Sequence, residues 1–241
     1  MPDALPPITA IIPAYQAEKS LRDVVRRTLA VVRDVLVVDD GSDDGTYRAA
    51  SEEGARVLRH PANFGKGRAL RTAFSDLFGN GATTVVTLDA DGQHCPEEIP
   101  RLLEAARSGA DLVIGTRDHI FDQMHPARRI SNTWSSKAIS FVAGAPLVDV
   151  QSGFRLYTRR LVDSTGFPES RFEAESAVIV RAVRMGFRIA CVPVRLGPAD
   201  GRATSHYRPI VDSLRIAGAV TRARLERIDH GDRVRSRAGK A

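Results

Sequence analysis

Short apolar runs alternate with amphipathic helical patterns along most of the chain, and this alternation constrains the fold more than any other feature. The runs are rich in β-branched residues, as expected of strands that are buried on both faces. Strands that alternate with helices at this spacing predict an α/β fold, with a mostly parallel sheet and helices on both of its faces. The predicted strands are 8–12, 35–38, 55–58, 83–88, 111–114, 152–157 and 187–192, and the predicted helices are 18–32, 67–78, 97–107, 126–142, 172–185 and 208–227. The first strand is expected to end at Pro13.

The composition is that of one globular domain. Of the 241 residues, 43% are hydrophobic and 27% are charged, which argues against disorder. No linker, repeat or low-complexity segment divides the chain, so we expect a single domain over residues 1–230. Neither a signal peptide nor a run of about 18 apolar residues is present. We therefore expect a cytoplasmic protein that is soluble or peripheral to the membrane.

The excess positive charge lies mostly at the end of the chain. The formal net charge is +6, and residues 222–241 hold seven basic and three acidic residues, a net of +4. The simplest interpretation is a basic, flexible tail over residues 231–241, and the alternative is a contact with anionic lipid headgroups. Nucleic-acid binding is disfavoured because aromatic residues are only 6% of the chain and do not alternate with the basic ones. Cys95 and Cys191 have no metal-site spacing, so we expect reduced thiols.

Four carboxylates follow predicted strands directly. Asp89 and Asp91 come after strand 83–88, and Asp39 and Asp40 come at the end of strand 35–38. Ligands of parallel sheets bind beyond the carboxyl ends of the strands, so these side chains should converge on one crevice. Asp89 and Asp91 are separated by one residue, and the amide oxygen of Gln93 is nearby. These three side chains suit Mg²⁺ or Mn²⁺ together with a substrate phosphate. The alternative for each motif is a polar turn or a helix cap.

Lys66 lies between two glycines at the start of a predicted helix. Gly65 and Gly67 would let the backbone approach a ligand, and Lys66 would add positive charge. The spacing differs from that of a P-loop. A simple turn is the alternative interpretation.

Six motifs in a fixed order resemble the inverting glycosyltransferases of family two, which have the GT-A fold. Within that family they are most similar to the dolichyl-phosphate mannose synthase and polyprenyl-phosphate glycosyltransferase group. The resemblance extends over roughly residues 8 to 215, and the ordered set is far more specific than any single motif. The motifs are Pro13-Ala14-Tyr15, Val38-Asp39-Asp40-Gly41-Ser42, Gly65-Lys66-Gly67, Asp89-Ala90-Asp91-Gly92-Gln93-His94, Gly115-Thr116-Arg117 and Asp149-Val150-Gln151-Ser152-Gly153-Phe154-Arg155.

The resemblance implies a role for each matching position. Residues 8–117 would bind the nucleotide-sugar donor and 118–228 the acceptor. Pro13, Tyr15 and Asp39, with Asp40 and Lys66, would line the nucleotide-sugar site, and Asp89 would lie beside the ribose and the metal. Asp91 and Gln93 would ligate Mg²⁺ or Mn²⁺, joined by His206. Arg117 and Arg202 would meet the diphosphate. The sequence departs from the family at Gln16-Ala17-Glu18, where Asn-Glu is common after the tyrosine, and at His206, where the mannose synthases often have lysine.

The acceptor decides whether a base is needed. A polyprenyl phosphate is already a nucleophile near pH 7, whereas a sugar hydroxyl requires a general base. Asp149 is the first candidate for orienting or activating the acceptor, Glu175 the second and Glu173 the third, with a solvated helix face as the alternative for the two glutamates.

We expect transfer from GDP-mannose or a UDP-hexose, with inversion, to a lipid phosphate at a membrane surface. Alternatives are transfer to a hydroxyl of a soluble or glycan acceptor, a binding protein without turnover, and a nucleotidyltransferase.

Overall fold

The structure is a computed structural model of the chain, and it describes residues 8–117, 139–144, 147, 149–197 and 209–227. Residues 139–143 are helical, in agreement with the end of the helix predicted over 126–142, whose other residues up to 138 lie outside the described part. The named elements are β1 (Thr9–Ala14), α1 (Glu18–Leu29), β2 (Asp34–Asp39), α2 (Thr46–Glu52), β3 (Arg56–Arg59), α3 (Lys66–Gly79), β4 (Thr84–Thr87), the 3₁₀ helix η1 (Pro96–Glu98), α4 (Ile99–Arg107), β5 (Leu112–Thr116), β6 (Arg155–Thr158), α6 (Arg159–Thr165), α7 (Glu173–Met185), β7 (Ile189–Pro193) and α8 (Pro209–Leu225).

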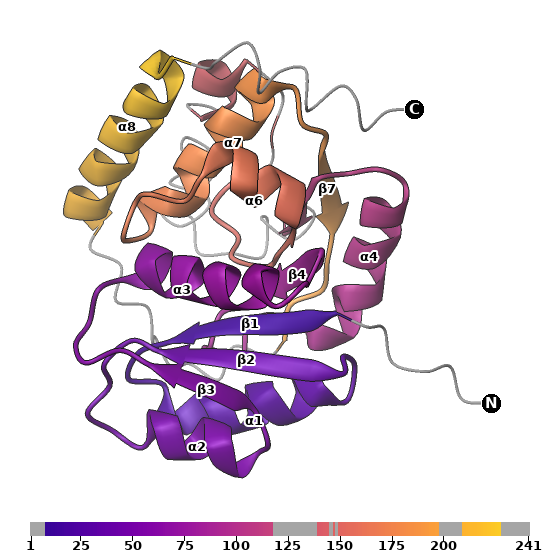
Figure 1. Cartoon of the computed structure of the whole chain (residues 1–241), viewed down its shortest axis with the longest axis vertical. Helices are drawn as coiled ribbons and strands as arrows, with labels where there is room; N and C mark the ends of the chain where they lie inside the picture. Colours follow the sequence, from indigo (N-terminus) through magenta and orange to yellow (C-terminus); the bar gives the residue numbers. More distant parts are fainter. Residues whose placement is uncertain (1–7, 118–138, 145–146, 148, 198–208, 228–241) are drawn as a thin grey trace.

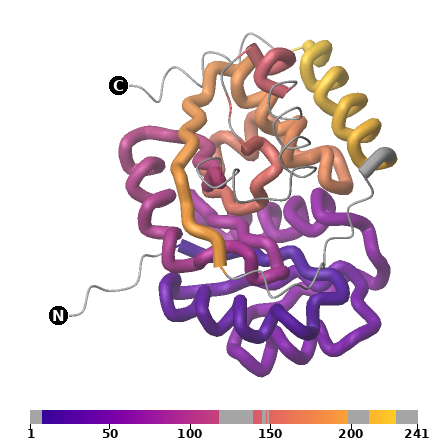
Figure 2. Tube along the Cα trace, turned by 180° about the vertical axis from the view of Figure 1, so that it is seen from behind, coloured from indigo at the N-terminus to yellow at the C-terminus, as the bar shows by residue number. Residues whose placement is uncertain are grey.

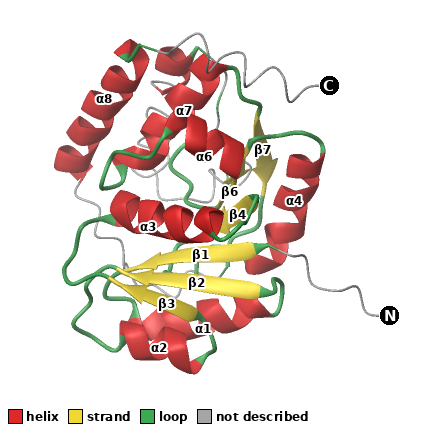
Figure 3. Ribbon diagram, viewed as in Figure 1, coloured by secondary structure: helices red, strands yellow, loops and turns green. Residues whose placement is uncertain are grey.

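Seven strands form one sheet in the order β3-β2-β1-β4-β6-β5-β7 (Figure 1 and Figure 3). All neighbouring strands are parallel except at β6, which runs antiparallel to both β4 and β5. The mostly parallel sheet predicted from the sequence is therefore confirmed. β6 belongs to the second half of the chain but lies between two strands of the first half, so both halves contribute to the same sheet.

Helices cover both faces of the sheet. Ile11, Leu36 and Val85 pack on one side with α3, α6, α7 and α8. Their neighbours along the strands, such as Ile12 and Val37, pack on the other side with α1, α2 and α4. The alternation follows from the two-residue period of a strand. Seen from behind, β7 runs alongside α4 and closes this edge of the molecule (Figure 2).

β1 continues through Pro13, where the sequence predicted its end. Pro13 pairs in register with Val38 of β2, and the strand ends one residue later. The pairing with β4 stops earlier, at Ile11, whose carbonyl oxygen accepts from Leu88 N at 3.0 Å. The backbone groups of residues 11 and 13 point towards the same neighbouring strand, β4. Because β4 no longer pairs with β1 at residue 13, the sheet loses no hydrogen bond through the missing N–H of Pro13. A proline is tolerated in a strand at such a position.

The region after residue 149 departs from the prediction in two ways. β6 starts at Arg155, three residues later than expected, because Asp149–Gly153 form a turn in which Asp149 has a positive φ of 47°. No element was expected over residues 159–165, where α6 lies. The side chain of Thr158 caps α6 by accepting from Leu161 N, and Gly166 ends the helix at a φ of 63°. A helix of this length has too few turns for its apolar period to be recognised.

Tyr157 of β6 is fully buried in the core beneath α3. Its ring meets those of Phe74 and Phe167 edge-on, with centroids 5.2 and 6.3 Å away. Burial of the hydroxyl raises the pKa of Tyr157 to about 12.

This raised pKa predicts a loss of stability at alkaline pH. Unfolded tyrosine loses its proton near pH 10, so stability should fall as the pH rises from about 10 towards 12, by about 2 kcal/mol from this group. Urea unfolding of the wild type and of Tyr157→Phe across that interval measures the effect. The phenylalanine variant should lose about 2 kcal/mol less over the same interval. Equal pH dependence in the two proteins would show that Tyr157 is not the group responsible.

Candidate active site

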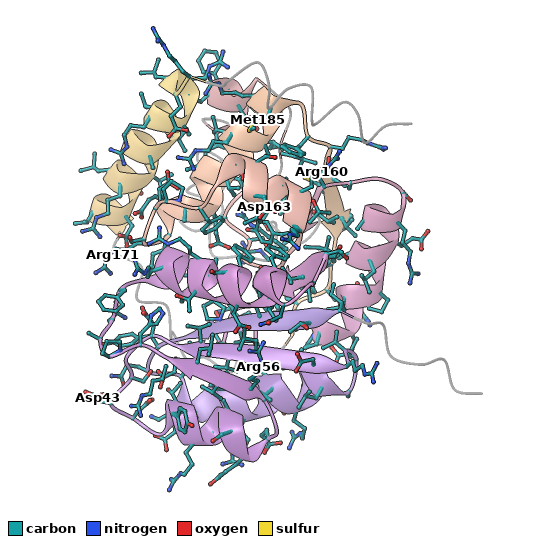
Figure 4. The ribbon with its side chains drawn as sticks, in the orientation of Figure 1. Asp43, Arg56, Arg160, Asp163, Arg171 and Met185 are labelled. Carbon is teal, nitrogen blue, oxygen red and sulfur yellow. The ribbon has the colours of Figure 1, made fainter. Side chains whose placement is uncertain are left out.

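The predicted site residues that follow strands β2 and β4 lie at the carboxyl edge of the sheet. β1, β2 and β3 point the same way, and the loop after β2 that carries Asp43 lies beyond their ends (Figure 4). Asp39 is the last residue of β2, and Asp89 lies two residues after β4. β1 separates these two strands, because β2 and β4 pair with its opposite sides.

Asp39 is a buried acceptor next to an open cavity. Its Oδ1 accepts from Ser42 N at 2.9 Å. Its Oδ2 lies 3.1 Å from Arg59 Nε, which is an ion-pair distance, yet this oxygen accepts no hydrogen bond within the described residues. Arg59 also lines a cavity of about 410 Å³ together with Gly41, Ser42, His60 and Pro61. A buried carboxylate oxygen with spare capacity suits an N–H or O–H donor of a ligand.

Asp40 holds the loop before α3. Its carboxylate accepts from Phe64 N at 3.0 Å and from Gly65 N at 2.7 Å, and it lies 2.7 Å from His60 Nδ1. The side chain is only 4% exposed. The structure therefore places Asp40 within the protein framework and leaves it little capacity for a ligand, although the sequence predicted a nucleotide contact.

Lys66 joins two carboxylates that are far apart in the sequence. Its ammonium lies 2.6 Å from Asp89 Oδ1 and 2.8 Å from Glu175 Oε2. Burial alone would lower the pKa of Lys66, but the two negative charges more than offset burial and raise it. Burial conversely favours a high pKa for Asp89, and Lys66 together with His94 brings the pKa of Asp89 below its ordinary value. Lys66 and Asp89 are therefore both charged at neutral pH.

The turn before β6 forms the wall of this cluster. A Cβ on Gly153 would lie 2.6 Å from Lys66 Nζ and from both carboxylate oxygens of Asp89, so a larger residue there would displace the ends of these two side chains. Behind it, the guanidinium of Arg155 is fully buried and donates to the carbonyl oxygens of Val150, Ser152 and Glu175. Arg155 thereby ties the turn to the first turn of α7.

The acidic loop after β4 is held from three sides. Asp89 N donates to His94 Nδ1 at 3.1 Å, so the imidazole proton lies on Nε2. Ser20 Oγ of α1 donates to Ala90 O at 2.7 Å, between the two aspartates. Gly197 N donates to Gln93 O at 2.9 Å. The ring of His94 is buried against Phe154, and burial lowers the pKa of His94.

The loop fits a divalent cation in part. Asp91 and Gln93 are partly exposed, and Asp91 uses one oxygen to accept from Gln93 N at 3.0 Å. Hard oxygen donors of this kind suit Mg²⁺ or Mn²⁺. Within the described residues, no three His, Cys, Asp or Glu side chains gather closely enough to hold a metal by themselves. The donor set therefore matches an ion that is shared with the oxygens of a bound diphosphate.

Asp149 is paired with Arg117. Both its carboxylate oxygens accept from the guanidinium, at 2.7 and 2.8 Å, and Oδ2 also accepts from Arg117 N at 2.9 Å. Asp149 is fully buried, and its positive φ is one that few non-glycine residues adopt. The contacts fit a residue that positions Arg117 at the end of β5. An Asp149→Asn substitution would disturb Arg117 whatever the acceptor, so it does not distinguish a phosphate acceptor from a hydroxyl.

The remaining predicted site residues lie either at the end of β1 or outside the described residues. Pro13 and Tyr15 lie at the end of β1 and are partly exposed. Gln16, where the family often has asparagine, has a positive φ of 54°, a conformation that asparagine adopts more readily. Arg202 and His206 lie outside the described residues, so their roles stay predictions.

Several framework residues were not predicted. His94 and Arg155 stand inside the quoted motifs, but nothing in the sequence indicates that one accepts a backbone N–H and the other binds three carbonyl oxygens. Ser20 lies on α1, and its only sequence signal is its place on the helix.

Comparison with known proteins gives the family. The model of the family described as glycosyl transferase family 2 matches residues 9–166. The chain belongs to glycosyl transferase family 2. The match includes the acidic loop, Arg117 and Asp149, so the site described above is built largely from the family's own region.

Two curated members of the family are similar over most of their length. An undecaprenyl-phosphate mannosyltransferase of Micrococcus luteus is 36% identical over 200 residues, which cover 78% of this chain and 82% of that protein. A polyprenol monophosphomannose synthase of Mycolicibacterium smegmatis is 33% identical over 202 residues, covering 76% and 75%. The resemblance to polyprenyl-phosphate glycosyltransferases is therefore confirmed.

Solved structures show the same fold. Glucosyl-3-phosphoglycerate synthase from Mycobacterium tuberculosis, crystallised with Mn²⁺, UDP-glucose and phosphoglyceric acid, superposes with a TM-score of 0.72 over 93% of this chain and 82% of its own. The sequence identity is 20%, so the likeness concerns the fold alone. The predicted GT-A fold is confirmed.

Gly153 offers a direct test of the site. In Gly153→Ala, the added methyl would overlap Asp89 and Lys66, and we expect a loss of glycosyl transfer of at least about 100-fold, the scale of a misplacement of about 1 Å. Far-UV circular dichroism should stay unchanged. Gly79→Ala is the matched control, since open space surrounds that position and neither Gly79 nor Gly153 has a positive φ. Retention of full activity by Gly153→Ala would show that Asp89 need not occupy this place.

The Lys66 cluster predicts non-additive stability. Lys66→Met leaves two buried or half-buried carboxylates without their cation and should cost about 3–5 kcal/mol of unfolding free energy. Adding Glu175→Gln removes one of the uncompensated charges, so the double variant should be more stable than Lys66→Met alone. Urea unfolding of the four proteins gives the coupling. Lys19→Met, on the exposed side of α1, is the matched control, and simple additivity would contradict the coupling.

Proposed function

We propose that this chain transfers a glycosyl residue from a nucleoside-diphosphate sugar to a polyprenyl phosphate, with inversion. The observation that carries the proposal is that Asp149 and Glu175, the first two candidates for a catalytic base, are each engaged by a cation, Arg117 and Lys66 respectively. A carboxylate held in this way is poorly placed to remove a proton. A phosphate acceptor needs no such base, because its dianion is present near pH 7. The two mannosyltransferase relatives support the same acceptor class.

The donor would lie across the carboxyl edge of the sheet. Asp39 Oδ2 would accept from the base or ribose, and Asp89, fixed by Lys66, would lie beside the ribose. Arg117, oriented by Asp149, would approach the diphosphate, and its side chain is 14% exposed. Burial alone would lower the pKa of Arg117, but the hydrogen bonds and charge of Asp149 raise it above its ordinary value. The nearby charges of Asp89 and Asp91 raise it further. The positive charge therefore faces the acidic loop where a diphosphate would lie.

A divalent cation would be held by Asp91 and Gln93, with His206 as a further predicted ligand. When bound, Mg²⁺ or Mn²⁺ supplies positive charge that stabilises the leaving diphosphate. Neighbouring structures that contain Mn²⁺ or Mg²⁺ with UDP support this choice of metal.

The reaction would be a single displacement at the anomeric carbon. An oxygen of the acceptor phosphate forms the new bond while the bond to the β-phosphate oxygen breaks, and the nucleoside diphosphate leaves with its electron pair. Arg117 stabilises the negative charge that develops on the leaving group. Gly153 and Arg155 keep the facing wall fixed, so the acceptor meets a preorganised site.

A hydroxyl acceptor is a second candidate function, and one observation favours it. Oε1 of Glu173 accepts from Arg171 N at 3.3 Å, while its buried Oε2 makes no hydrogen bond within the described residues. Glu173 stands at the start of α7, two residues before Glu175. It could serve as a base for an alcohol, and Glu173→Gln would then abolish transfer to a hydroxyl acceptor.

Product analysis tests the proposed function. We expect that one of GDP-mannose, UDP-glucose or UDP-N-acetylglucosamine, with Mn²⁺ and a polyprenyl phosphate in detergent, releases the nucleoside diphosphate and forms a glycosyl lipid. Asp91→Asn should lower the rate at least about 100-fold, since it removes a ligand of the charge-stabilising ion. Asp23→Asn, on the exposed side of α1, is the matched control. Release of pyrophosphate would indicate nucleotidyl transfer, and donor binding without product would indicate a binding protein.

A further inference from the structure

α8 carries an apolar stripe on its outward face. Ala219, Val220 and Ala223 are buried against the rest of the protein. Val211, Leu214 and Leu225 are 43%, 69% and 76% exposed. At about 100° per residue, the second set lies on the side of the helix opposite to the first. A stable helix of a globular protein normally presents polar residues there.

Basic residues flank this stripe on both sides. By the same helical geometry, Arg215 and Arg222 border one side of the stripe and Arg224 borders the other, and all three are exposed. Of these, Arg215 pairs with Asp212 at 3.3 Å. Arg222 and Arg224 have no ion pair with an acidic residue in the described part of the chain. The outward face is thus apolar along its middle and positively charged at its margins.

The lower end of α8 lies on the side of the molecule where α3 starts (Figure 1). Arg171 lies where the lower end of α8 approaches the start of α3 (Figure 4), and a Cβ on Gly65 would lie 2.6 Å from Arg171 Cγ. Phe64, beside Gly65, is 43% exposed, with the guanidinium of Arg68 5.9 Å from the centre of its ring. Lys66 follows directly and contacts Asp89. Arg171 is exposed as well, so one exposed basic and one exposed apolar side chain lie beside Gly65, directly before Lys66.

We propose that Phe64, Val211, Leu214, Leu225, Arg222 and Arg224 form a docking surface for an anionic lipid bilayer. The three apolar residues of α8 would enter the interface between headgroups and acyl chains, and the arginines would meet lipid phosphates. The bilayer would then lie beside the rim of the site. The inference rests on the proposed function in one respect: the purpose of this docking surface would be to bring a lipid-borne phosphate to Asp89 and Arg117.

A bilayer fits this face better than a second copy of the chain. In a twofold contact along α8, the arginines of each copy would face those of the other, and like charges repel. Gly218 and Thr221 occupy the middle of the stripe, where a helix–helix seam needs larger apolar residues. A bilayer accommodates both features because its headgroups carry the opposite charge and its surface adapts to an uneven stripe. Within the described residues, no helix is both long and apolar enough to cross a membrane.

Vesicle sedimentation tests the surface without any donor. The full chain should bind vesicles of phosphatidylcholine with phosphatidylglycerol and should bind pure phosphatidylcholine vesicles much more weakly. Leu214→Asp with Leu225→Asp should weaken binding at least about 30-fold. Arg222→Glu with Arg224→Glu should weaken binding to anionic vesicles at least about 25-fold and reduce its salt dependence.

Tyr47→Asp is the matched control for vesicle binding. Tyr47 is 43% exposed, as Phe64 and Val211 are, but it lies on α2, across the sheet from α8 (Figure 1). Its substitution should leave vesicle binding unchanged. Equal binding by the wild type and the leucine variant would overturn the proposal, as would a concentration-dependent dimer that the same leucine substitutions dissolve.

Transfer assays separate this surface from the proposed function. The leucine variant should lose transfer to a polyprenyl phosphate embedded in vesicles, yet keep wild-type transfer to a short-chain isoprenyl phosphate in solution. If the wild type binds vesicles through these residues but transfers to neither acceptor, the proposed function fails and the docking surface stands. If the leucine variant transfers to both acceptors as well as the wild type does, the docking surface fails and the proposed function stands.

Discussion

The ammonium of Lys66, whose side chain is only 14% exposed, makes the contacts on which the arrangement of the site depends. It neutralises Asp89 from the loop after β4 and Glu175 from α7, two segments that no other described side chain joins in this way. Without the cation, two carboxylates would remain uncompensated in a poorly solvated place, which is energetically unfavourable. With it, Asp89 keeps its charge and a fixed position, while its side chain remains 31% exposed towards the open edge of the sheet.

A small number of such contacts turns an ordinary sheet edge into a rigid surface. Arg155 donates to three carbonyl oxygens and so adds stiffness to the turn before β6, and its Nε also lies 3.8 Å from Glu175 Oε1. Asp149 orients Arg117 through three hydrogen bonds. Asp149 and Glu175 hold the cations Arg117 and Lys66 in place, while Asp39 Oδ2 and Glu175 Oε1 accept no hydrogen bond within the described residues. With Asp149 and Glu175 engaged by cations, the site favours an acceptor that arrives already ionised.

Much of the fold can be predicted from the sequence, because the patterns that indicate strands and helices are both local. Runs such as 35–38 are apolar throughout, and amphipathic segments such as 18–32 repeat every three to four residues, so strands and helices are recognisable one at a time. The exceptions are local conflicts that tertiary contacts resolve. Pro13 remains in β1 because the neighbouring ladder has already ended, and α6 is too short for its period to be recognised.

The sequence by itself determined the α/β class, the strands that end in carboxylates and the family to which their motifs belong. Those features depend on composition and spacing within segments of a few residues. Only the tertiary structure decided what each charged side chain does, because its partner comes from a distant part of the chain. Lys66 lies 109 positions before Glu175, and no local rule pairs them. Asp149, Glu175 and Asp40 likewise contact partners from other segments, namely Arg117, Lys66 and the loop before α3, and no local pattern of the sequence indicates these contacts.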